Sequence, residues 1–159
     1  MCIRDRFYYN QYIRAKSLEE AYELYQKRQN FIVGGMLWTK MKNTTLGTAI
    51  DLCELGLDGI EENENEFRIG AYVSLRDIET NESLNKYTDN AFADSVKDIV
   101  GVQFRNVATV GGSIWGRYGF SDVMTIFRAL GAKVELFHEG IMELDDFVKL
   151  PRTVRDILA

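Results

Sequence analysis

Phe31-Ile32-Val33-Gly34-Gly35 is one of two stretches that decide the fold, and Val107-Ala108-Thr109-Val110-Gly111-Gly112-Ser113 is the other. In each, an apolar run typical of a strand ends in a glycine pair, and a segment typical of a helix or turn follows. A strand that ends in Gly-Gly can turn with positive φ and bring bare N–H groups close to a ligand. Phosphate is the usual ligand of such a turn. Two such turns in one small protein therefore favour a dinucleotide cofactor whose diphosphate is held from both sides.

The composition indicates one compact domain with a substantial core. Of the 159 residues, 46% are hydrophobic and 12% aromatic, which is enough to bury apolar side chains in a chain of this length. The net charge of -5 argues against nonspecific nucleic-acid binding, which needs Lys and Arg to neutralise phosphates. No apolar stretch reaches the roughly 18 to 20 residues of a membrane span, and no signal-peptide core is present. We expect an acidic cytoplasmic protein with no nucleic-acid or membrane partner.

The sequence offers few metal ligands. Its cysteines are Cys2 and Cys53, and its histidine is His138, too few for a disulfide framework, a zinc site or an iron–sulfur cluster. We expect Cys53 to be a small core residue and His138 to lie exposed at a hairpin tip. Metal chemistry, if any, belongs to another chain.

Residues 1–56 suggest a small βαβ-like lobe. Met1 to Arg6 shows no periodicity, so this segment is either a frayed end or a leader foreign to the fold. Ser17-Leu18-Glu19-Glu20 is a capping box that predicts a helix start. Strands are expected at 31–33 and 48–50, with a helical turn between them.

The rest of the chain alternates between helices and short strands. The acidic segment 61–66 predicts a solvated hairpin tip, and Ser74 to Asp77 predicts a helix cap. A later helix carries Phe92, Val96 and Ile99 and stops at Gly101. Another begins at Ser121-Asp122 and stops at Gly131, before a strand over 132–136. The tail 155–159 resembles the beginning of a strand.

The first glycine turn offers backbone donors to a pyrophosphate. The N–H groups of Gly34, Gly35, Met36 and Leu37 can converge on its oxygens, supported by the positive end of the following short helix. The alternative is a tight strand-to-helix turn in which glycine serves only the backbone geometry.

The second glycine turn adds side-chain donors. Thr109 and Ser113 place hydroxyls on either side of Gly111-Gly112, where they can donate to phosphate oxygens. Asp122 either caps its helix or accepts hydrogen bonds from a ribose or a ring edge.

Arginines and aromatic residues surround the second turn. Arg105 and Arg117 bracket it and either offset cofactor charge or lie solvated. Trp115, Tyr118 and Phe120 follow it and either wall a planar ring or pack between lobes. Because the sequence has no Ser/His/Asp set, carboxylate pair or Walker-type lysine, redox chemistry carried by a bound cofactor fits better than hydrolysis or phosphoryl transfer. A sugar-nucleotide enzyme is a third reading, but no general base supports it.

At this point the residues resemble a known family. The run Arg105-Asn106-Val107-Ala108-Thr109-Val110-Gly111-Gly112-Ser113-Ile114, with Phe120-Ser121-Asp122 and Ala129-Leu130-Gly131-Ala132, looks like the FAD-binding subunit of molybdenum hydroxylases. This is the medium-subunit type of xanthine dehydrogenase and carbon monoxide dehydrogenase, a family of molybdopterin dehydrogenases. Val33-Gly34-Gly35 before a short helix is similar to the same family. The resemblance runs from about Phe7 to the last residue.

The resemblance implies an α+β fold of two lobes, the FAD-binding PCMH type shared with vanillyl-alcohol oxidase. A small βαβ lobe would span 7–56, and a larger lobe with a mixed or antiparallel sheet would span 57–159 and be incomplete. The family's C-terminal domain would be absent. No catalytic and no metal-binding residue is implied, and the implied cofactor-binding residues are Phe31, Ile32, Val33, Gly34, Gly35, Met36, Leu37, Trp38, Ile99, Thr109, Val110, Gly111, Gly112, Ser113 and Asp122.

By the same resemblance, the chain is an FAD-dependent oxidoreductase subunit of a hetero-oligomer. Electrons would pass from a molybdopterin subunit, through a [2Fe-2S] subunit, to FAD here and then to NAD. The alternative is a noncatalytic docking fragment with an incomplete flavin site. The chain departs from the family pattern at Met36-Leu37, where Thr-Asp is common, at Ser113, where Asn is common, and at Gly119-Phe120, where many members have a proline.

Overall fold

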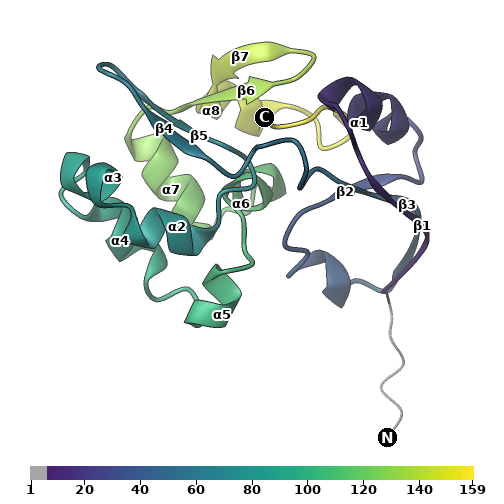
Figure 1. Ribbon diagram of the computed structural model, residues 1–159, viewed down its shortest axis with the longest axis horizontal. Helices are drawn as coiled ribbons and strands as arrows, with labels where there is room; N and C mark the ends of the chain where they lie inside the picture. The colour runs from purple at the N-terminus through teal and green to yellow at the C-terminus, as the bar shows by residue number, and fades with distance from the viewer. Residues whose placement is uncertain (1–6) are drawn as a thin grey trace, which may run out of the picture.

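The computed structural model describes residues 7–159, and its first lobe is a parallel three-stranded sheet in the order β1-β3-β2 (Figure 1). β1 (Phe7–Arg14) and β2 (Phe31–Val33) both pair with the central β3 (Thr44–Asp51). The helix α1 (Leu18–Tyr25) and the 3-10 helix η1 (Thr39–Met41) form the connections. The interpretation of residues 1–6 lies outside the described residues.

The sequence analysis found this lobe only in part. It missed β1 entirely and found only the last part of β3. Most side chains of β1 are exposed, so this edge strand lacks the alternation of buried and exposed residues that marks a half-buried strand.

The helix α1 starts where the capping box predicted, but one of the two capping hydrogen bonds has a different donor. The Ser17 hydroxyl accepts from the N–H of Glu20 at 3.1 Å. The Glu20 carboxylate accepts from the N–H of Lys16 at 2.7 Å, one residue before the position that a capping box uses. The face of α1 that covers the sheet contributes to one buried apolar cluster, whose members are Ala15, Ala21, Tyr25, Ile50, Leu52 and Ile157.

The second lobe is mainly helical and has a larger apolar core of its own. Two antiparallel hairpins, β4-β5 and β6-β7, lie above the helices α2 to α7 in Figure 1. The elements are β4 (Ile60–Glu62), β5 (Phe67–Ile69), α2 (Leu75–Thr80), α3 (Glu82–Tyr87), α4 (Ala91–Val96), α5 (Val102–Arg105), α6 (Val110–Gly116), α7 (Asp122–Ala129), β6 (Lys133–Leu136), β7 (Gly140–Glu143) and α8 (Leu144–Lys149).

The α+β class is confirmed, while the sheet of the larger lobe differs from the expectation. Each hairpin pairs with itself, because its strands have only three or four residues and the helices α2 to α7 separate the two hairpins along the chain. The PCMH assignment and the boundary between 56 and 57 stay predictions.

Several local predictions are confirmed. Of the acidic segment 61–66, residues 63–66 connect β4 to β5, while Glu61 and Glu62 belong to β4. Ser74 and Asp77 form a reciprocal capping box. Gly131, with φ of 63°, follows the end of α7, and the exposed His138 lies between β6 and β7. Among residues 7–159, no helix has the length and apolar character needed to cross a bilayer.

Two local predictions are wrong. Cys53 is exposed, because it follows the end of β3 and its neighbour Leu52 takes the core position with 2% exposure. The helix α4 ends at Val96, so Ile99 lies beyond it.

The C-terminal segment 150–159 touches both lobes (Figure 1, yellow). Ile157 belongs to the buried cluster of the first lobe, while Leu158 forms an isolated bridge with Leu136 of β6. The Arg155 guanidinium donates to the carbonyls of Tyr25, Lys27 and Asn30 at 2.6, 2.9 and 2.8 Å. The predicted strand at the tail is therefore reduced to one bridge, and the segment ties the lobes together.

Candidate functional site

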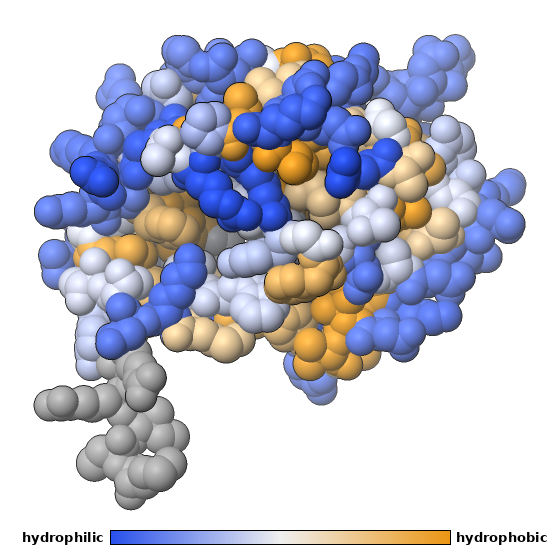
Figure 2. Space-filling view, turned by 180° about the vertical axis from the view of Figure 1, so that it is seen from behind, coloured by the Kyte–Doolittle hydropathy of each residue, from blue (hydrophilic) through white to orange (hydrophobic). Residues whose placement is uncertain are grey.

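A cavity of about 490 Å³ lies between the lobes, and both glycine turns line it. Its size falls within the range of small-molecule and cofactor sites. Because residues of both glycine turns line it, the two predicted halves of the site lie around one cavity. On the side of the molecule shown in Figure 2, apolar residues are exposed in separate patches among hydrophilic ones.

The two turns contact each other, and glycine permits this contact. A Cβ atom on Gly35 would lie 1.9 Å from the carbonyl oxygen of Val107, far inside any tolerated distance. A Cβ atom on Gly34 would lie 3.2 Å from Oγ1 of Thr109. Part of the reason for the first glycine pair is therefore the close approach of the two lobes.

The first turn carries free backbone donors. Met36 has φ of 55°, the left-handed conformation that a non-glycine residue rarely adopts. Within residues 7–159, the N–H groups of Gly34–Trp38 donate to no acceptor, and all five residues line the cavity. A run of unpaired N–H groups beside a cavity is a donor set that suits phosphate oxygens.

The second turn is built differently. It does not end a strand: Thr109 forms only an isolated bridge with Ser74 and is the N-cap of α6. The backbone donors that follow are already paired. The N–H groups of Val110, Gly111, Gly112 and Ser113 donate to Val73 O at 2.9 Å, Ala71 O at 2.8 Å, Thr109 Oγ1 at 3.1 Å and Thr109 O at 3.1 Å, respectively.

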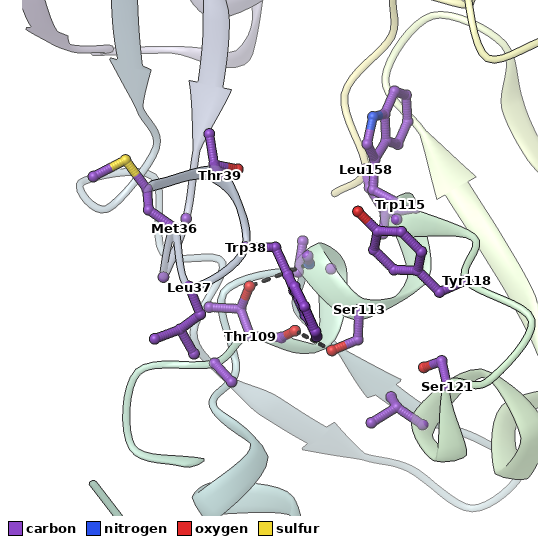
Figure 3. Close-up of a pocket in the computed structure, with 18 of the residues that line it drawn as sticks. Met36, Leu37, Trp38, Thr39, Thr109, Ser113, Trp115, Tyr118, Ser121 and Leu158 are labelled. Carbon is purple, nitrogen blue, oxygen red and sulfur yellow. Dashed lines mark hydrogen bonds between the residues drawn. The ribbon is translucent and has the colours of Figure 1, made fainter. Parts of the chain in front are cut away.

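The two hydroxyls of the second turn differ in whether their hydrogen is already donated within the protein. The Ser113 hydroxyl donates to the carbonyl of its neighbour Thr109 at 2.9 Å, a dashed line in Figure 3. The Thr109 hydroxyl accepts from Gly112 and keeps its own hydrogen for a ligand. Of the two predicted hydroxyl donors, that of Thr109 is therefore available.

An aromatic cluster joins the lobes across the cavity. Trp38 extends from the first turn toward Ser113, with Tyr118 on the opposite side (Figure 3). The Trp38 ring lies 5.9 Å from the ring of Tyr118 and 6.2 Å from that of Phe120. Trp115 packs instead against Phe147 at 5.5 Å. The predicted wall therefore includes a tryptophan from the first turn.

Of the charged residues near the second turn, some are paired inside the protein and others line the cavity. Arg105 is 5% exposed and donates to both carboxylate oxygens of Glu79 at 2.7 and 3.1 Å. This ion pair lowers the pKa of Glu79, so Arg105 is a structural residue and does not line the cavity. Lys42, Arg117 and Arg152 do line it, which gives its wall positive charge.

Asp122 does not cap α7 with its side chain. The Ser121 hydroxyl caps that helix by accepting from the N–H of Met124 at 3.2 Å. The Asp122 carboxylate is exposed, lines the cavity and makes no hydrogen bond to any residue of 7–159. It is therefore open to a ligand.

Tyr72 connects the lobes behind the first turn. Its hydroxyl donates to the carbonyl of Val33, and it accepts from the N–H of Leu52 at 3.0 Å. Asp51 lies at 3.2 Å from the same hydroxyl, and burial raises the Tyr72 pKa. This network holds the carboxyl ends of β2 and β3 against the second lobe.

All but two of the fifteen predicted cofactor-binding residues line the cavity. Val33 and Val110, which are 3% and 2% exposed, lie in the apolar cores instead. The sequence analysis missed further lining residues, among them Tyr25, Lys42, Tyr72, Arg152, Ile157 and Leu158. These come from segments far apart in the chain, and no local motif marks them.

The comparisons with known proteins point to one family. Residues 6–158 match the model of the FAD binding domain in molybdopterin dehydrogenase. An uncharacterized protein, YgfM of Escherichia coli K12, is 26% identical over 145 residues, which cover 89% of this chain and 54% of that protein.

The structural comparisons agree. The Cu,Mo-CO dehydrogenase in its cyanide-inactivated form has a TM-score of 0.78 and 26% identity, covering 87% of this chain and 51% of that one. Quinoline 2-oxidoreductase from Pseudomonas putida 86 has a TM-score of 0.82 and 18% identity, covering 99% and 58%. At that identity, the second likeness shows the fold alone.

The chain thus spans about half the length of the relatives it matches. The match to the family model nevertheless covers nearly all of the described residues. The chain belongs to the family of FAD-binding domains of molybdopterin dehydrogenases.

Proposed function

We propose that this chain binds FAD between its lobes and serves as the electron-transfer flavin subunit of a molybdenum hydroxylase. The observation that carries the proposal is the run of unpaired N–H groups at Gly34–Trp38, which lines the cavity between the lobes. The residues present fit the group, because these donors match diphosphate oxygens and the lining cations exceed the lining carboxylates. Bound FAD supplies reversible electron transfer.

In this proposal, the residues divide the binding task. The N–H groups of Gly34–Trp38 and the Thr109 hydroxyl hold the diphosphate. Asp122 accepts hydrogen bonds from ribose or a ring edge, and Ile99 gives an apolar surface. Trp38 and its aromatic neighbours Tyr118 and Phe120 exclude water from the cavity.

The wider assembly is also part of the proposal. The complex is cytoplasmic and xanthine dehydrogenase-like. A molybdopterin subunit reduces [2Fe-2S] clusters on another partner subunit, these clusters pass electrons to this chain, and NAD is the final electron acceptor. The resemblance in sequence supports this, as does the likeness to a Cu,Mo-CO dehydrogenase. In this proposal, the ligands of the iron–sulfur clusters and of the molybdopterin cofactor belong to the partner subunits.

The test is reconstitution with FAD, followed by its absorbance and equilibrium dissociation constant. The Gly112→Val variant introduces a side chain at the cavity, where even a Cβ atom would lie 2.9 Å from Thr109 Oγ1. We expect it to lose FAD binding while it keeps its circular dichroism spectrum. Gly119→Val is the matched control, because no atom lies within 4 Å of a Cβ placed there. Equal FAD binding by Gly112→Val and wild type contradicts the assignment.

The second candidate is a noncatalytic role in which this chain docks the partner subunits without binding FAD. Affinity capture of the iron–sulfur and molybdopterin subunits without bound FAD supports it. Tight FAD binding with no captured subunit contradicts it.

A further inference from the structure

The three-residue segment 71–73 contacts both glycine turns. The carbonyls of its first and last residues accept from the N–H groups of Gly111 and Val110 in the second turn, at 2.8 and 2.9 Å. The side chain between them, that of Tyr72, reaches the first lobe, where its hydroxyl donates to the Val33 carbonyl. One short segment therefore connects the two turns that line the cavity.

The hydroxyl of Tyr72 bridges the ends of two strands. It donates to the carbonyl of Val33, the last residue of β2. It accepts from the N–H group of Leu52, the residue after β3, at 3.0 Å. The only hydrogen of this hydroxyl is thus used within the protein, so Tyr72 acts on a ligand through Val33.

Val33 is joined to the first free donor of the turn by one peptide bond. A peptide unit is planar, and in its trans form the N–H group points away from the C=O group. None of the peptide bonds in residues 7–159 is cis. The bond from Tyr72 to the Val33 carbonyl therefore fixes the direction of the Gly34 N–H group. Because Gly34 and Gly35 restrict their own dihedral angles less than other residues do, the direction of the free donors depends on this anchor.

We propose that Tyr72 is a positioning residue that holds the first turn in register with the second for a diphosphate group. This inference rests on the proposed FAD binding, and Tyr72 is not among the residues that the family resemblance implies. Its hydroxyl orients the donors of the first turn, while the carbonyls on either side of it hold the second turn. The two turns thus keep the spacing that a diphosphate between them requires.

A second tyrosine belongs to the same hydrogen-bond network and provides a matched control. Asp51 Oδ1 lies 3.2 Å from the Tyr72 hydroxyl, and Asp51 Oδ2 accepts from the Tyr12 hydroxyl at 2.5 Å. Tyr12 is exposed on β1 and does not line the cavity. Tyr12→Phe therefore removes a hydroxyl from the network and leaves the bond to Val33 intact.

The test compares Tyr72→Phe, Tyr12→Phe and wild type in FAD titrations and in phosphorus NMR spectra of the bound FAD. Tyr72→Phe keeps the ring but releases the Val33 carbonyl. We expect its FAD dissociation constant to rise about tenfold, equivalent to one hydrogen bond to a charged group, and its diphosphate resonances to shift. Tyr12→Phe keeps the wild-type dissociation constant and resonances. A merely structural role of Tyr72 would lower the stability without moving these resonances.

Asp51→Asn is the second variant, and circular dichroism checks that each variant folds. It removes the charge that competes with the Val33 carbonyl for the Tyr72 hydrogen, so we expect FAD affinity at least equal to that of wild type. An affinity loss of about tenfold in Asp51→Asn overturns the inference, and this variant decides the matter if Tyr72→Phe does not fold.

The remaining outcomes separate the positioning role from the proposed function. Diphosphate resonances of Tyr72→Phe at wild-type positions, or equal shifts in Tyr12→Phe, overturn the positioning role alone, as does unchanged FAD affinity in Tyr72→Phe. A wild-type protein that binds no FAD overturns the proposed function and this inference together.

Discussion

The two glycine turns have similar sequences but opposite hydrogen-bonding states. At Gly34-Gly35 the backbone N–H groups are unpaired and Met36 is left-handed. At the second turn the N–H groups of residues 110–113 are all paired. Those of Val110 and Gly111 donate to carbonyls of the segment 71–73, and those of Gly112 and Ser113 donate to Thr109, the N-cap of α6. A glycine pair after an apolar run therefore predicts close backbone approach, but it does not tell whether a ligand or another segment of the chain approaches.

The largest expected effect is at the contact between the turns. Gly35→Ala places a Cβ atom 1.9 Å from the Val107 carbonyl oxygen, so the lobes must separate. We expect a loss of at least about 3 kcal/mol in the free energy of unfolding, as for severe overpacking, measured by urea denaturation. Gly119→Ala, where a Cβ meets no atom within 4 Å, is the control. A Gly35→Ala protein as stable as this control would show that the turns do not press together.

The next largest effect is expected at the ion pair between Arg105 and Glu79, which lies just before the second turn in the chain. Arg105, which also donates to the carbonyl of Ile99 at 3.2 Å, loses its charged partner in Glu79→Gln. We expect a loss of about 2 kcal/mol near pH 7, less than the full cost of breaking a buried pair because Gln still accepts a hydrogen bond.

The pH dependence gives a sharper form of the same test. Arg105 holds the Glu79 pKa below its ordinary value of 4.5, so the stabilisation is complete above that value and disappears as the pH falls through the lowered pKa. Wild type should lose stability more steeply than Glu79→Gln below about pH 4.5, in denaturation curves measured at each pH. Parallel curves would contradict the assigned role.

A smaller effect is expected at the cap of the second turn. Thr109→Ala leaves the Gly112 N–H without its acceptor, at a cost of about 1 kcal/mol in unfolding free energy. Thr109→Ser keeps the hydroxyl and should recover most of the loss. If alanine and serine are equally stable, the hydroxyl does not cap α6.

The smallest effect is expected at the first turn. Met36 occupies a left-handed conformation that Asn tolerates better than Met. We expect Met36→Asn to raise the unfolding free energy by about 0.5 kcal/mol, since the side chain changes while the N–H remains. FAD affinity should stay at the wild-type value, because the proposed donors at this turn are backbone groups. A destabilised variant would contradict the assigned turn conformation.

Local signals were predictable because their causes are local. Ser17 and Ser74 cap helices as their spacing indicates, and Gly131 follows the end of α7 with positive φ. The edge strand β1 was not predictable in this way, since its exposed side chains show no alternation. Cys53 was expected in the core as a small residue close to the apolar Ile50 and Leu52, whereas it lies exposed beyond the end of β3 at Asp51.

The sequence by itself determined the family motif and the glycine positions, because these depend on residue type and short spacing, and the resemblance to the family then implied the α+β class. The tertiary structure decided which N–H groups are free, that Arg105 pairs with Glu79, and that Tyr25, Arg117 and Arg152 line one cavity. Such properties depend on contacts between segments that are distant in the chain, 26 residues apart for Arg105 and Glu79 and 130 residues apart for Arg155 and Tyr25. Local spacing carries no information about which donors those contacts leave unpaired.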